Sequence, residues 1–183
     1  TQVGDMARIP VFFDKKKKPI IDALVEDAVK ISRTDWDSFE TSWDFERHPM
    51  VCNLHTVATA YKKWKSETIE RFEILKTKEE ELNHIFIEIY GLQEELAPDV
   101  DDKDVTVYRI FDSKEDIPES MAGSRYALTK QDAIKSFISY AVGCMFGRYS
   151  LDIEGLAYAG GEWDSEKYKT FVPDKDNILP ICD

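Results

Sequence analysis

Histidine and cysteine, the side chains best suited to acid–base, nucleophilic or metal chemistry, are scarce in this chain of 183 residues. The histidines are His48, His55 and His84, and the cysteines are Cys52, Cys144 and Cys182. No two cysteines have the close spacing of a zinc site, and the HExxH pattern of zinc peptidases is absent. Pro49 also makes a single helix through His48 and His55 unfavourable. We therefore predict no metal site here.

Carboxylates are abundant, but their spacing does not match a site either. An acidic run between residues 99 and 104 lacks the glycine and the final glutamate of an EF-hand calcium loop. The chain also lacks the GxSxG turn of serine hydrolases and the P-loop of nucleotide-binding proteins. The sequence thus predicts no catalytic and no cofactor-binding residue of its own.

Two groups of lysines could bind a ligand through their charge. They are Lys15, Lys16, Lys17 and Lys18 in one run, and Lys62, Lys63 and Lys65 in a second cluster. Such clusters can contact nucleic-acid phosphates, although a solvated turn is the commoner role of a lysine run. The net charge of −12 argues against a chain that binds nucleic acid mainly by itself. We place any phosphate contact at these seven lysines.

A long helix is the main element expected to position these groups. From about residue 53 to residue 90, bulky apolar side chains recur at alternating spacings of three and four, as in a coiled-coil seam. Thr77 and Glu80 have capping-box spacing, so a break there is an alternative, and Gly91 suits the helix end. The amphipathic segment 20–31 is the expected antiparallel partner.

A second helix is predicted for residues 131–147, in the longest stretch with few charges. The apolar run is shorter than the roughly 20 residues that a bilayer span needs, and Lys135 and Arg148 bracket it. We therefore predict a buried core helix and no membrane segment. Gly143 and Gly147 lie on one face of it, where they would let another backbone approach closely.

The remaining segments are predicted to be extended or looped. Residues 3–13, residues 105–111 and parts of 168–183 are expected to be extended, and 112–129 an exposed connection. Four aromatic residues are expected to pack against a helix, with the indole N–H groups bonded. They are Trp36, Phe39, Trp43 and Phe45. A platform for stacked bases is the alternative, but the surrounding carboxylates would repel phosphate.

Together these elements predict a mainly α fold, in which a long coiled-coil-like helix and packed helices are joined by a few short strands. We divide the chain into a helical spacer region, 1–98, and a region 99–183 with a linker, the buried helix and a loop-rich end; one compact unit is the alternative. Three widely spaced cysteines and no signal peptide favour a cytoplasmic protein. Both ends resemble cuts in a longer polypeptide.

Five runs of sequence resemble the C-terminal half of adenine-specific DNA methyltransferases of the BREX phage-exclusion type, the PglX family. They are DWDSFETSWDF (35–45), LNHIFIEIYGLQEEL (82–96), DVTV (104–107), ISYAVGCMFGRYSLDIEGLAYAGGEWD (138–164) and FVPDKDNILPI (171–181). The resemblance covers most of the chain, from about residue 3 onward. Residues 112–129 depart from the pattern and look like an insertion.

The resemblance implies a parent enzyme that transfers a methyl group from S-adenosylmethionine to adenine N6 in a phage-defence system. Such enzymes hold a flipped adenine with an (N/D)PP(Y/F) motif, and this chain has neither that motif nor a glycine-rich S-adenosylmethionine loop. The expected role is a non-catalytic helical segment that positions the DNA-recognition and methyltransferase parts. Its partners would be DNA, the rest of the methyltransferase chain and other defence-system proteins. The alternative is an acidic protein-interaction module that docks another defence component.

Overall fold

The computed structural model describes residue 8, residues 10–12 and residues 14–173. Within these residues lie the helices α2 (Lys18–Trp36), α3 (Val57–Tyr90) and α4 (Lys130–Met145), the strands β1 (Arg109–Phe111) and β2 (Ala127–Thr129), and the 3-10 turns η1 (Asp102–Asp104), η2 (Glu119–Met121) and η3 (Ser165–Lys167). The predicted mainly α fold with a few short strands is confirmed. The extended segment expected at 3–13 lies mostly outside the described residues, as do residues 174–183.

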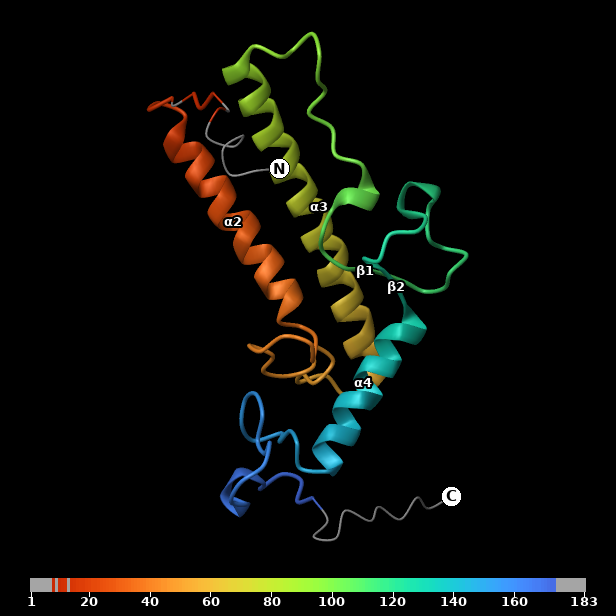
Figure 1. The fold of residues 1–183 in the computed structure, drawn as a ribbon. Helices are drawn as coiled ribbons and strands as arrows, with labels where there is room; N and C mark the ends of the chain where they lie inside the picture. The colour runs from red at the N-terminus through yellow and green to blue at the C-terminus, as the bar shows by residue number, and fades with distance from the viewer. Residues whose placement is uncertain (1–7, 9, 13, 174–183) are drawn as a thin grey trace.

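Helices α2 and α3 form an antiparallel hairpin (Figure 1), which confirms the predicted partner of the long helix. Pro19 in the first turn of α2 suits a helix start, since the missing N–H would have no partner there. Ion pairs join the two helices at the start, the middle and the end of α2. The pairs are Lys17–Glu88, Asp27–Lys78 and Asp35–Arg71, with N–O distances of 2.6, 2.7 and 3.4 Å.

Helix α3 runs unbroken for 34 residues, about 50 Å at 1.5 Å per residue. It begins after Thr56, whose hydroxyl oxygen accepts a hydrogen bond from the N–H of Thr59, and it ends at Gly91, whose φ of 69° suits glycine. The alternative break at Thr77 is wrong, because the Thr77 hydroxyl donates to the carbonyl of Glu73 instead of capping a new helix. The buried residues of α3 are Ala60, Tyr61, Trp64, Thr68, Phe72, Leu75 and Ile87.

Strands β1 and β2 pair in parallel, with Ile110 opposite Leu128. The expectation that 112–129 is only an exposed connection is therefore wrong. Its last three residues form β2, and Met121 is completely buried in the core. The strand escaped detection because three residues are too few to display an alternating pattern.

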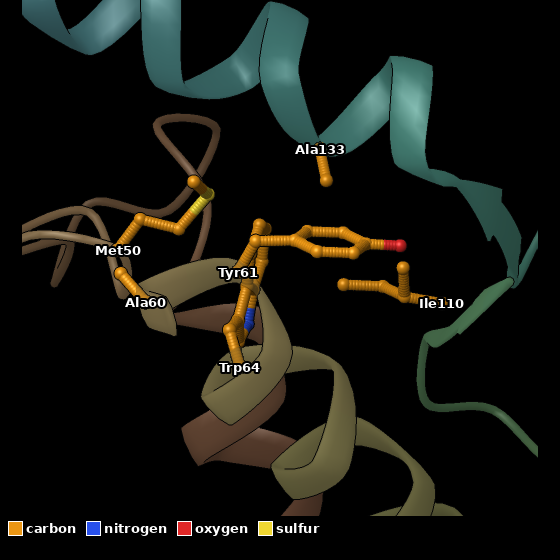
Figure 2. Close-up of a cluster of buried hydrophobic side chains, with 6 residues drawn as sticks. All are labelled: Met50, Ala60, Tyr61, Trp64, Ile110 and Ala133. Carbon is orange, nitrogen blue, oxygen red and sulfur yellow. The ribbon is translucent and has the colours of Figure 1, made fainter. Parts of the chain in front are cut away.

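The core is assembled from both sides of the boundary expected near residue 98. Figure 2 shows one cluster, in which Met50, Ala60, Tyr61 and Trp64 meet Ile110 and Ala133. A second cluster packs Phe72 and Leu75 of α3 against Val105, Val107, Phe111 and Met121. A third gathers Phe45, Tyr140, Cys144 and Tyr149. Helix α3 thus supplies side chains to clusters that also contain the later part of the chain.

Helix α4 buries only one of its faces. A capping box starts it, in which Thr129 and Asp132 each bond the backbone N–H of the other. Ala133, Tyr140 and Cys144 are buried. The opposite stripe of Ile138, Val142 and Phe146, which are 55%, 41% and 45% exposed, corrects the expectation of a helix with little surface in water. We name these three residues the α4 outer stripe.

Gly143 in α4 and Gly147 just after the helix each leave room for an aromatic ring. A Cβ atom at Gly143 would lie 2.6 Å from the ring of Tyr149, and one at Gly147 would lie 2.6 Å from the ring of Trp163. The sequence predicted that another backbone would approach these glycines, but the close neighbours are aromatic side chains. The Trp163 ring in turn stacks on Tyr168 at 4.5 Å, so residues after α4 fold back on its end.

Candidate functional site

The two groups of predicted phosphate-contacting lysines lie at opposite ends of the α2–α3 hairpin. Lys17, just before α2, pairs with Glu88 near the end of α3, whereas Lys62, Lys63 and Lys65 lie in the first turns of α3. The intervening helix separates the two groups by roughly 40 Å. The structure therefore does not bring the seven lysines into one site.

The first lysine group is partly neutralised by neighbouring carboxylates. Lys17 pairs with Glu88 and Lys18 with Asp22, while Lys15 and Lys16 are exposed at the turn. The Asp14 carboxylate accepts the backbone N–H of Lys16 at 2.8 Å, which anchors the turn. Two ammonium groups of the run thus face solvent.

The second lysine group borders a hollow of about 770 Å³ between α3 and α4. We call it the α3–α4 groove, and its lining residues are Val57, Ala58, Tyr61, Lys62, Lys65, Ser66, Ile69, Asp112, Lys130 and Ile134. Lys130, the first residue of α4, joins Lys62 and Lys65 there. Lys130 is far from the other two in sequence, so only the packing of α4 on α3 reveals the grouping. Lys63 lies outside the lining and pairs with Glu67.

Asp112 is the one carboxylate among the lining residues. It accepts hydrogen bonds from the Tyr61 hydroxyl at 3.0 Å and from Lys65 Nζ at 2.6 Å. The hydrogen bond from Lys65 holds the pKa of Asp112 below its usual value. Lys130 Nζ lies 5.3 Å from the centre of the Tyr61 ring. Among the described residues, Lys62 and Lys130 have no ion-pair partner.

The aromatic cluster of residues 36–45 is only half packed. Phe39 contacts the rings of Trp64 and Tyr108, as expected. Trp36 is 54% exposed and Trp43 is fully exposed, so the expectation that both indoles pack with bonded N–H groups is wrong. The four aromatics cannot share one face because their segment leaves α2 at Trp36 and turns.

His48 is a core residue. Its Nδ1 accepts the backbone N–H of Met50 at 3.2 Å, so the proton is on Nε2, which donates to Ser136 Oγ at 3.2 Å. Burial lowers the pKa of His48 to about 4. Cys144 is also buried, and burial raises the pKa of its thiol, which disfavours the reactive thiolate. Neither residue has the environment of a catalytic group.

Nowhere in residues 8, 10–12 and 14–173 do three candidate ligand side chains cluster around one point. In dinucleotide-binding folds, a glycine-rich turn between a strand and a helix contacts the cofactor phosphates. Here β2 runs directly into α4 at Thr129 and Lys130, with no glycine between them. None of the described helices is both long and apolar enough to cross a membrane.

The chain is similar over its whole length to part of known adenine-specific methyltransferases. It is 43% identical over 188 residues to the adenine-specific methyltransferase PglX of Lacticaseibacillus casei (strain Zhang), covering 100% of this chain and 14% of that protein. It is 33% identical over 187 residues to the adenine-specific methyltransferase BrxX of Escherichia coli O9:H4 (strain HS), covering 98% of this chain and 15% of that protein. The resemblance to PglX-type methyltransferases is thus confirmed. No protein-family model matches the chain.

Proposed function

We propose that this chain is a non-catalytic helical segment of an adenine-N6 DNA methyltransferase in a phage-defence system. Its role is to hold the DNA-recognition part and the methyltransferase part at a set distance. The observation that carries the proposal is the unbroken helix α3, braced by α2 between Arg71 and Glu88, in a chain that matches 14% of a PglX methyltransferase. A braced helix of about 50 Å is a stiff spacer.

The surface properties of the chain support this assignment. The α4 outer stripe is an apolar face of the kind that packs against another part of the same polypeptide. In the parent enzyme, the S-adenosylmethionine site and the adenine pocket would belong to other parts of the chain. DNA would be bound in the cytoplasm, with phosphate contacts from this segment at Lys15, Lys16, Lys17 and Lys18 and at Lys62, Lys63 and Lys65.

The experiment is to kink α3 in the intact methyltransferase. Glu70 is exposed in the middle of α3, so Glu70→Pro would remove one helical hydrogen bond and bend the helix at a cost of about 3 kcal/mol. We expect DNA methylation to be lost while S-adenosylmethionine binding is retained. Glu70→Ala, which keeps the helix straight, should methylate normally. Unchanged methylation by Glu70→Pro would refute the spacer role.

A second candidate function is an acidic module that docks another defence component, which the net charge of −12 favours. Chemical cross-linking of the intact methyltransferase in cells separates the two functions. Cross-links from this chain only to the same polypeptide and to DNA agree with the spacer. Cross-links to a second protein, lost when the acidic loop at 99–104 is neutralised, agree with the module.

A further inference from the structure

We propose that the α3–α4 groove binds the sugar-phosphate backbone of DNA, with Lys130 as a contact residue beside Lys62 and Lys65. This inference rests on the proposed function, and it assigns the DNA contact to a specific groove of the chain. Three lysines from two helices border this single hollow. The first lysine group, roughly 40 Å away, also borders a hollow, of about 680 Å³. Its lysines all come from one turn, and they share that hollow with the carboxylates of Asp14 and Glu88.

The charge of the groove is opposite to that of the chain. Lys62 and Lys130 are exposed and lack an ion-pair partner in the described part of the chain, and the lining carboxylate, Asp112, is bonded to Tyr61 and Lys65. The groove is therefore locally positive in a chain with a net charge of −12. An anionic ligand supplies the missing counter-charge, and a phosphate backbone offers evenly spaced charges.

The remaining lining residues favour contact with the backbone over contact with bases. Val57, Ala58, Ile69 and Ile134 give the groove an apolar part, which suits the carbon faces of deoxyribose. Tyr61 is 4% exposed and Lys130 Nζ lies over its ring, so the ring is closed to a stacking base. Contacts made only to phosphate and sugar orient DNA without reading its sequence.

The test measures how tightly the intact methyltransferase binds duplex DNA. Fluorescence anisotropy gives the affinity at salt concentrations between 50 and 200 mM. Each lost phosphate contact lowers the salt slope by about 0.9. The Lys62→Gln/Lys130→Gln variant should therefore lose about two units of slope and bind roughly tenfold more weakly. The control is Lys30→Gln, which makes the same type of substitution at an exposed lysine on α2. It should leave the salt slope and the affinity unchanged.

Asp112→Asn provides a change in the opposite direction. It removes the negative charge from the groove and frees Lys65 from its ion pair, so DNA should bind more tightly, with a slope steeper by up to about one unit. Misfolding cannot produce this gain. Wild-type affinity and slope in the double lysine variant would overturn the proposal. So would unchanged DNA binding combined with lost binding of a glutamate–leucine peptide, because the groove would then be a protein-docking site.

These outcomes are separate from a failure of the spacer role. If the lysine variants bind DNA normally but Glu70→Pro still abolishes methylation, only the groove assignment fails. If Glu70→Pro methylates normally while the lysine variants lose salt slope, the spacer role fails and the phosphate contact stands.

Discussion

The carboxylate of Asp35, at the end of α2, accepts a hydrogen bond from the backbone N–H of Tyr108, 2.9 Å away. The same carboxylate pairs with Arg71 of α3 at 3.4 Å. Asp35 is 2% exposed, and burial raises its pKa although Tyr108 and Arg71 both favour the charged form. One buried carboxylate thus connects α2, α3 and the segment that leads into β1.

Removing this carboxylate should destabilise the whole fold. Asp35→Ala leaves Arg71 without its partner and the Tyr108 N–H unbonded, so we expect a loss of about 3–5 kcal/mol in the free energy of unfolding. Asp35→Asn should lose less, because an amide oxygen can still accept from Tyr108. Urea denaturation of the three proteins measures both losses. A loss below about 1 kcal/mol for Asp35→Ala would contradict the connecting role.

His48 should make stability depend on pH. The pKa of an unfolded histidine is about 6.5, and that of His48 in the folded chain is about 4. Between these values the unfolded state binds more protons, so stability falls as the pH falls from 6.5 towards 4. The full shift corresponds to about 3 kcal/mol.

The variant His48→Gln isolates this effect. Glutamine does not titrate, while carboxylates that titrate in the same range contribute equally to both proteins. We expect the difference in unfolding free energy between wild type and variant to change across pH 4–6.5 and to be constant above pH 7. A difference that is constant across the whole range would show that His48 is not buried as a neutral ring.

The two regions divided near residue 98 should unfold as one unit, because all three core clusters contain residues from both sides. Trp64 is 1% exposed, whereas Trp36, Trp43 and Trp163 are all about half exposed or more. Replacing these three with phenylalanine leaves Trp64 as the single fluorescent reporter of the core. Its unfolding midpoint should coincide with that of circular dichroism. Two separate transitions would instead support two units.

Gly143 should tolerate no side chain. Alanine favours helices over glycine by about 1 kcal/mol, yet its Cβ would lie 2.6 Å from a ring atom of Tyr149. We therefore expect Gly143→Ala to lower the free energy of unfolding by about 1–3 kcal/mol. In a Tyr149→Leu background the penalty should shrink or change sign. An equal penalty in both backgrounds would exclude the ring contact as the cause.

The sequence predicted the elements with strong periodicity and missed those set by packing. The apolar spacing of α3 and the glycine at its end are local signals, so the helix and its end at Gly91 agree with expectation. Thr77 had the right spacing for a cap, but the continuous packing of α2 along α3 favours an unbroken helix. β2 is held by pairing with β1 and has almost no pattern of its own.

The α3–α4 groove likewise could be predicted from the sequence only in part. Lys62 and Lys65 were visible as a cluster because they share one helix. Lys130 and Asp112 join them only because β1 docks on α3 and Ala133 of α4 packs into the cluster around Tyr61 and Trp64. Nothing in the sequence near Lys130 distinguishes it from other surface lysines. The exposure of Trp43 was equally hidden, since it depends on how the loop turns after α2.

The ion pairs at the start, middle and end of α2 fasten it to α3 and stiffen the hairpin. A rod of about 50 Å that tilts by about 5° around one end moves its far end by roughly 4 Å. The aromatic core around Trp64 holds one end of the hairpin, and the lysine turn before α2 lies at the opposite end. A small rearrangement at the core would therefore become a displacement of several ångströms at the tip.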